Sequence, residues 1–186
     1  MKQILKLGLT LAAFAVVSCL ALAVVNNFTA PVIEKNNAAK TSAALTVVFP
    51  QADSFESVTA EKSINSTTID GVWLAKNGDA VLGGIAKVTG PTYDKATILV
   101  GFDKNMKISG VVILEISDSP GFGQNAKDSS YKTSSGKTFY EQFAGVDASK
   151  TVVSGTDFEA ISGATITSVG IAALINDAAA AVKGAF

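Results

Sequence analysis

The stretch ATILVGFDKNMKISGVVILEI, residues 96–116, decides the fold of the C-terminal part of this chain. Its two arms, Ala96 to Phe102 and Lys107 to Ile116, are rich in valine and isoleucine, which favour strands. Between the arms, Asp-Lys-Asn at 103–105 is typical of a turn. The stretch therefore predicts a β-hairpin.

A second strand pair precedes this hairpin in the sequence. Val72 to Ala75 and Ala80 to Val88 have strand-like composition, and Lys-Asn-Gly-Asp at 76–79 separates them as a turn. Gly-Pro-Thr at 90–92 predicts a turn or loop leading to the 96–116 hairpin. Together these strands predict a twisted, largely antiparallel sheet.

The C-terminal run predicts a helix to pack on that sheet. Within Thr165 to Val182, apolar residues recur at helical spacing, and Gly184 ends the run. The predicted fold class is α+β. Between the sheet and this helix we expect a loop over 117–137, a short amphipathic helix over 138–144 and a short strand over 151–153.

The N-terminal segment has the character of a membrane anchor. Leu7 to Val25 is uncharged and would form a helix of roughly 28 Å, close to the thickness of a bilayer core. Lys2 and Lys6 precede it, which predicts a cytoplasmic N-terminus and an extracytoplasmic C-terminal domain on a single-pass protein of the inner cell membrane. A cleaved signal peptide and a lipoprotein signal ending at Cys19 are the alternatives.

The chain beyond this segment divides into two further parts. Asn-Asn-Phe-Thr-Ala-Pro at 26–31 predicts a break in the helix, and Val32 to Val48 a separate juxtamembrane helix that ends before Pro50. Residues 51–70 are rich in serine and threonine and have no clear assignment. The expected parts are residues 1–26 as the membrane segment, 27–70 as juxtamembrane helix and connector, and 71–186 as the folded domain.

Missing residue types exclude several kinds of site. The sequence contains no histidine, one cysteine, and 15 basic residues that are all lysine. Imidazole ligands, histidine-based triads and clusters held by four thiolates of this chain are therefore excluded. A bound phosphate would be held by backbone N–H groups, lysine or a covalent bond, because no guanidinium is available. The formal charge of −1 disfavours nucleic acid as a partner, and we expect neither a metal site nor a catalytic acid or base.

The helix expected from Thr165 begins in a turn with many hydroxyl groups, Ser-Gly-Ala-Thr-Ile-Thr-Ser at 162–168. A helix N-terminus presents free N–H groups and the positive end of the helix dipole, which suits a phosphate. The plain alternative is that Ser162, Thr165, Thr167 or Ser168 caps the helix and Gly163 makes the turn. Local sequence leaves both interpretations open.

Residues 159–165, Glu-Ala-Ile-Ser-Gly-Ala-Thr, resemble the flavinylation motif Asp-Gly-x-Ser/Thr-Gly-Ala-Thr. That motif belongs to the FMN-binding domain of Rnf-type complexes and Na⁺-translocating NADH:quinone oxidoreductases, where the last threonine carries FMN through a phosphoester. The resemblance implies covalent FMN on Thr165, and Glu159 departs from the family's aspartate by one methylene. The other binding residues expected in this stretch are Ser162, Gly163, Ala164 and Thr167.

The resemblance extends over nearly the whole chain. Residues 26–33 are similar to the family's membrane exit, Asn-x-x-Thr-Ala-Pro-x-Ile, and 118–123 resemble its Glu-Thr-Pro-Gly-Leu-Gly loop, with Phe-x-x-Gln-Phe-x-Gly following at 139–145. Because that loop is expected near the flavin, three of its residues are further candidates: Pro120, Gly121 and Gly123. The aromatic residues that either stack on the ring or pack in the core are Trp73, Tyr93 and Tyr131.

The length of the chain favours the G subunit of the Rnf complex within this family. The resemblance then implies an electron-transfer subunit without independent turnover, in a membrane complex that couples redox chemistry to Na⁺ or H⁺ transport. Its expected partners are the other membrane subunits and the flavin transferase that matures it. The alternatives are a flavin-carrying reductase subunit for an extracytoplasmic acceptor and an anchored binding module without catalytic function.

Overall fold

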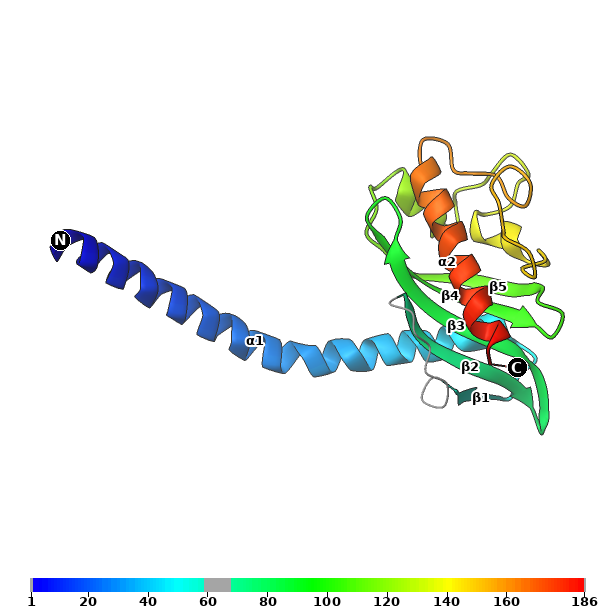
Figure 1. Ribbon diagram of the computed structural model, residues 1–186, viewed down its shortest axis with the longest axis horizontal. Coiled ribbons are helices and arrows are strands. Elements are labelled where there is room, and N and C mark those ends of the chain that lie inside the picture. The colour runs from blue at the N-terminus through cyan, green and yellow to red at the C-terminus, as the bar shows by residue number, and fades with distance from the viewer. Residues whose placement is uncertain (1, 59–67, 186) are drawn as a thin grey trace. The chain divides into compact units, whose positions relative to one another are not determined.

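A computed structural model of the protein describes residues 2–58 and 68–185. Two compact units make up the chain, Met1–Lys40 and Thr41–Phe186. The long helix α1, Lys2–Val48, runs through the first unit and ends inside the second. The second unit contains the sheet and the C-terminal helix, as Figure 1 shows.

Helix α1 is continuous, so the predicted break at 26–31 is wrong. Pro31 lies inside the helix and lacks an N–H donor, but the helix continues on both sides of it. Nearby, the Thr29 hydroxyl donates to the Val25 carbonyl at 3.0 Å and so bonds to the helix backbone itself. The juxtamembrane helix expected over 32–48 is the C-terminal part of α1.

Two helices of the described chain are long and apolar enough to cross a membrane, α1 and the C-terminal helix α2, Thr165–Lys183. The apolar part of α1 is 0% buried within the protein, whereas 56% of the corresponding part of α2 is buried. Burial explains the apolar composition of α2, which is the core helix that the sequence predicted. It leaves α1 as the helix with a long apolar segment that the rest of the described chain does not cover.

The sheet contains strands in the order β1-β2-β3-β4-β5, each antiparallel to its neighbour. Their bounds are β1 Ser54–Ser57, β2 Ile69–Asn77, β3 Ala80–Pro91, β4 Lys95–Asp103 and β5 Ile108–Ile116. Both predicted hairpins are thus confirmed, since β2 pairs with β3 and β4 with β5. Strand β1 was not predicted, and it lies in the segment that had no assignment.

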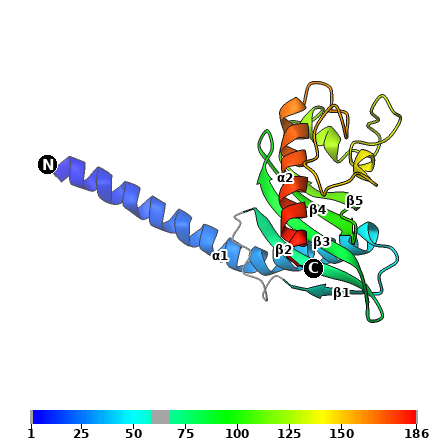
Figure 2. The ribbon, with the colours of Figure 1, turned by 45° about the vertical axis from the view of Figure 1, so that its right-hand side comes forward.

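Alternating side chains of these strands face two separate cores. On one face Ile98, Val100 and Phe102 of β4 pack in the main core with Ile171 and Ile175 of α2. Figures 1 and 2 show α2 along this face. The other face packs against the last turns of α1 and has its own core: Ala44, Leu45, Val48, Phe49, Ala75, Ile85 and Leu99.

Residues 117–164 form the loops around the N-terminal end of α2 (Figure 2). They contain two 3₁₀ turns, η1 Gly123–Ala126 and η2 Tyr140–Phe143, so the helix expected over 138–144 is a single 3₁₀ turn. Phe139 and Phe143 anchor this region through an edge-to-face contact with ring centroids 5.3 Å apart.

The strand expected over 151–153 does not form. The Val152 N–H donates to the Asn176 side-chain oxygen at 2.8 Å, and the Asn176 amide donates to the Val152 carbonyl at 3.2 Å. A side chain of α2 therefore satisfies the backbone groups that a neighbouring strand would otherwise have paired.

Candidate functional site

The first turn of α2 is organised by a buried hydroxyl. Ser168 accepts a hydrogen bond from the Ile161 N–H at 3.0 Å and donates one to the Ala164 carbonyl at 2.9 Å. The Ala164 N–H donates to the Ile161 carbonyl at 2.9 Å, which closes the turn before the helix. Gly163 lies in this turn at φ +75°, a backbone conformation that side-chain-bearing residues rarely adopt. Ser168 thus fixes the turn from inside the helix.

The N-terminus of α2 has no side-chain cap from the described part of the chain. The backbone N–H groups of Thr165, Ile166 and Thr167 donate to no acceptor within residues 2–58 and 68–185. The Thr165 side chain beside them is exposed. Free N–H groups and the helix dipole at this end favour an anion, and the exposed hydroxyl offers a point of attachment next to it.

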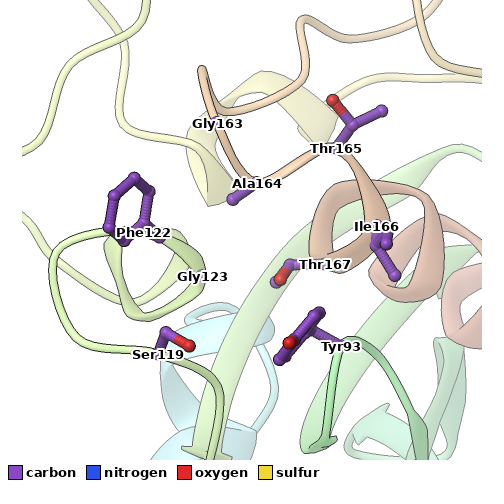
Figure 3. A pocket seen from close by; sticks show the side chains of 9 residues that line it. All are labelled: Tyr93, Ser119, Phe122, Gly123, Gly163, Ala164, Thr165, Ile166 and Thr167. Atoms are coloured by element: carbon purple, nitrogen blue, oxygen red, sulfur yellow. The ribbon is translucent and has the colours of Figure 1, made fainter.

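A pocket of about 470 Å³ opens beside this helix start (Figure 3). Its volume falls within the range of roughly 300–1,000 Å³ that is usual for small-molecule sites. None of the described residues that line the pocket carries a charged side chain. The lining residues are Tyr93, Ser119, Phe122, Gly123, Gly163, Ala164, Thr165, Ile166 and Thr167. Tyr93 comes from the β3–β4 turn and Phe122 from the loop after β5, and Figure 3 shows the two rings on separate sides of the pocket.

Three of the exposed apolar side chains of the protein surround this pocket. Tyr93, Phe122 and Ile166 keep 67%, 55% and 62% of their surface accessible. Apolar and aromatic side chains gathered around one concavity are a usual feature of small-molecule sites. The pocket therefore offers apolar and aromatic contacts at its walls and hydrogen-bond donors at its helix end.

Asp118 lies beneath the pocket and is only 1% exposed. One carboxylate oxygen accepts from the Thr92 hydroxyl at 2.6 Å and the Asp94 N–H at 2.9 Å. The other accepts from the Thr167 hydroxyl at 2.5 Å and the Tyr93 N–H at 3.3 Å. Asp118 therefore ties the β3–β4 turn, its own loop and the first turn of α2 together at one point.

These bonds decide the charge of Asp118. Burial opposes ionisation, but the hydrogen bonds from Thr167, Thr92, Asp94 and Tyr93 outweigh it and hold the pKa of Asp118 below its ordinary value. The carboxylate is therefore charged at neutral pH. A buried charge is tolerated only when it is well hydrogen-bonded, and donors to both oxygens meet that condition here.

Gly123 makes this close packing possible. A Cβ atom added there would lie 2.5 Å from the Asp118 Cβ and 2.6 Å from the Thr167 hydroxyl oxygen. A side chain at this position would therefore push the loop away from α2. At Gly163 the positive φ is the stronger constraint, and an added Cβ would also lie 3.1 Å from the Phe122 ring.

The residues predicted for the site fall into two groups. The pocket lining includes Gly163, Ala164, Thr165, Thr167 and Gly123. The residues beside it, outside the lining, are Ser162, Pro120 and Gly121, all of them exposed.

The three aromatic residues considered for stacking on the flavin also fall into two groups, one at the pocket and one in the cores. Tyr93 lines the pocket, whereas Trp73 packs with the second core and Tyr131 against the main core. Core packing, the alternative left open for each of these rings, therefore describes Trp73 and Tyr131.

Glu159, which departs from the flavinylation motif at its acidic position, lies outside the pocket lining. Its carboxylate accepts from the Ser134 hydroxyl and, at 3.1 Å, from the Ser134 N–H. Its backbone exchanges hydrogen bonds with the Gln142 side chain at 2.9 and 3.2 Å. Glu159 thus connects the segment before Ser162 to the loops that contain Ser134 and Gln142.

Sequence reasoning missed the central position of Asp118 and the pocket roles of Phe122 and Ile166. In the sequence, Asp118 stands out only as a departure from a glutamate of the related motif. Its partners lie 24–26 residues before it and 49 residues after it, so no local sequence pattern predicts these contacts. The one available signal was the placement of Asp118 two residues before Pro120, where the Pro-Gly-x-Gly loop begins.

Two family models match this chain. Residues 92–180 match the FMN-binding domain, and residues 1–48 match the RnfG N-terminal region. The chain is also 31% identical, over 195 aligned residues, to the G subunit of the Na(+)-translocating ferredoxin:NAD(+) oxidoreductase complex of Acetobacterium woodii. That alignment covers 94% of this chain and 89% of the relative. The N-terminal match ends where α1 ends, and the second begins at Thr92 beside the pocket.

Proposed function

This chain belongs to the family of Rnf complex G subunits and contains their FMN-binding domain, and from that premise we propose that its FMN is esterified to Thr165. As a member of that family it is an electron-transfer flavoprotein subunit of a membrane oxidoreductase complex. The observation that carries the proposal is the exposed Thr165 hydroxyl at the rim of the pocket, next to backbone N–H groups that have no acceptor among the described residues.

The helix start suits the phosphate of FMN. The N–H groups of Thr165, Ile166 and Thr167 are available to an anion, and the helix dipole favours negative charge there. The sequence has no arginine to clamp a phosphate, and the described lining of this pocket includes no lysine. A covalent bond through the Thr165 hydroxyl would therefore retain a cofactor that weak, exposed contacts could lose.

The walls of the pocket suit the ring system of FMN. Tyr93, Phe122 and Ile166 offer exposed aromatic and aliphatic surface on which a planar ring can pack. The close approach of the loop to α2 at Gly123 keeps these walls near the attachment point. When bound, FMN supplies the redox chemistry, since it accepts and releases electrons one or two at a time.

The protein's own contribution is binding, orientation and electrostatic environment. Aspartate, glutamate, lysine and histidine are absent from the described lining of the pocket, so it offers no general acid or base apart from the Tyr93 phenol. Electron relay needs none. The arrangement therefore supports a carrier subunit that depends on its partners for donor and acceptor.

The proposed setting is a membrane complex that couples electron transfer to Na⁺ or H⁺ transport. Helix α1 would anchor the protein with its N-terminus in the cytoplasm, since Lys2 and Lys6 precede its apolar part, and the flavin domain would be extracytoplasmic. The other membrane subunits would provide the electron route, and a flavin transferase would make the phosphoester.

The proposal is tested by the intact mass of the full-length protein after co-expression with a flavin transferase. Wild type should gain the mass of one FMN less one water, and Thr165→Ala should gain nothing. Thr165→Ser should keep the modification because it keeps a hydroxyl at that position. Thr156→Ala is the matched control, since it removes an exposed hydroxyl nine residues before Thr165 and outside the motif, and it should leave the modification intact.

Flavin fluorescence of the denatured protein gives an independent measurement. Wild-type protein should remain fluorescent after unfolding and electrophoresis, and Thr165→Ala should not. An unmodified wild type beside an active transferase, or a modified Thr165→Ala, would contradict the attachment site. A flavinylated protein that purifies from membranes without other Rnf subunits would instead favour a separate reductase subunit.

A further inference from the structure

The buried carboxylate of Asp118 has no place in the attachment chemistry, yet it contacts several residues of the pocket. Its oxygens accept from Thr167 and Tyr93, which both line the pocket, and Gly123 packs against its side chain. Ser119, another lining residue, is its neighbour in the chain. A charged group in contact with the pocket residues can affect the shape of the pocket and the reduction potential of a cofactor bound there.

We propose that Asp118 is the positioning residue of the flavin pocket and the negative charge that lowers the reduction potential of the bound flavin. This inference rests on the proposed function and extends it to a residue outside the attachment motif. Asp118 would touch neither the phosphate nor the attachment hydroxyl. It would act through Thr167 and through the backbone of the β3–β4 turn.

The positioning role follows from the hydrogen bonds. Thr167 lies in the first turn of α2, two residues after the attachment threonine, and its hydroxyl is held by Asp118 at 2.5 Å. The Thr92 hydroxyl and the Tyr93 N–H bring the wall residue Tyr93 to the same carboxylate. One side chain therefore sets the separation between the attachment point and an aromatic wall.

The electrostatic role follows from burial. Reduction adds electrons to the flavin, and a fixed negative charge nearby opposes that addition. Because Asp118 is 1% exposed, water and salt screen its charge less than they screen a surface carboxylate. Charges beside a redox cofactor are one of the means by which a protein sets its potential.

The experiment measures two properties of the flavinylated full-length protein: the reduction potential and the visible circular dichroism of the flavin, which reports how firmly the ring is held. Asp118→Asn removes the charge and puts an amide where the carboxylate accepted four hydrogen bonds. It should shift the potential to a more positive value and weaken the dichroism. Thr92→Val removes one donor and keeps the charge, so it should weaken the dichroism with a smaller change in potential.

Asp103→Asn is the matched control. Asp103 accepts from the N–H groups of Asn105 and Lys107, both at 2.8 Å, in the β4–β5 turn. It lies at the opposite end of β4 from the pocket, about 25 Å away at the usual rise per strand residue. The substitution removes the same charge and should change neither property.

The outcomes separate the inference from the proposed function. A flavinylated Asp118→Asn protein with the wild-type potential and dichroism would overturn this inference alone, as would an equal shift in Asp103→Asn. A wild type that takes up no flavin would overturn the proposed function and the inference with it. Should Asp118→Asn fail to fold, an unchanged dichroism in Thr92→Val would overturn the positioning role.

Discussion

Hydroxyl groups in the first turn of α2 have opposite environments although they are close in the sequence. Thr165 is exposed, whereas Thr167 is 2% exposed and Ser168 is fully buried. The sequence allowed any of them to cap the helix. The distinction depends on which side of the helix meets Asp118 and Ile161, and only the packed loops determine that. The resemblance to the flavinylation motif predicted Thr165 as the attachment site, and the exposure of Thr165 is consistent with that role.

Asp118 should also shape the stability of the domain at acid pH. Because its pKa is lower in the folded protein than in the unfolded chain, its ionised form stabilises the fold above about pH 4, and that stabilisation is lost as the pH falls through the folded pKa. We expect the free energy of unfolding to fall less between pH 7 and pH 3 in Asp118→Asn than in wild type, measured by urea denaturation.

Other carboxyl groups leave part of the acid sensitivity in place. The free energy of unfolding of Asp118→Asn should therefore still fall with pH, but less steeply than that of wild type. The four further groups whose pKa values are lowered are Asp53, Asp128, Glu141 and Asp147. Equal acid sensitivity in wild type and variant would show that folding does not lower the pKa of Asp118.

Secondary structure was predictable where the pattern is local. The β2–β3 and β4–β5 hairpins follow from branched apolar residues on either side of a turn. Strand β1, Ser-Phe-Glu-Ser, is short and almost wholly exposed, so it offers no apolar alternation to detect. Its strand conformation comes from pairing with β2. For residues 151–153 a strand was predicted and does not form, because the Asn176 side chain bonds the backbone N–H and carbonyl of Val152.

Helix α2 should contribute to stability through one side only. Ile175 is fully buried in the main core, while Val169 on the same helix keeps half its surface exposed. Ile175→Ala should lower the free energy of unfolding by about 2–5 kcal/mol because it leaves a cavity. Val169→Ala, the matched control, should cost only about 0.5 kcal/mol, as is usual for surface substitutions. Urea denaturation measures both, and similar losses would contradict the assignment of the buried face.

At the scale of the whole molecule, the sheet of the second unit has both faces covered. Helix α2 covers one, and the end of α1 with Phe49 covers the other. The sequence predicted an α+β domain, which is confirmed, but it placed residues 27–70 outside that domain as a juxtamembrane helix and connector. The contacts of Leu45 and Val48 with Ile85 and Leu99 depend on three-dimensional packing that a pattern of short apolar segments does not reveal.

Shortened chains can test this second core. A protein that begins at Thr41 keeps the last turns of α1 and should remain folded and monomeric in solution. One that begins at Gln51 exposes Ala75, Ile85 and Leu99, and should unfold at lower urea concentration or self-associate. Size-exclusion chromatography and urea denaturation compare the two. Equal behaviour would show that the end of α1 contributes nothing to the fold.

The surface position of Thr165 has a consequence for the order of events in biogenesis. Its hydroxyl stands free at the beginning of an already formed helix, with the preceding turn closed by Ser168. No unfolding is required to reach it. Under the proposed attachment at Thr165, a flavin transferase would therefore act on folded protein, and a chain that folds before it meets its flavin donor would still present the acceptor.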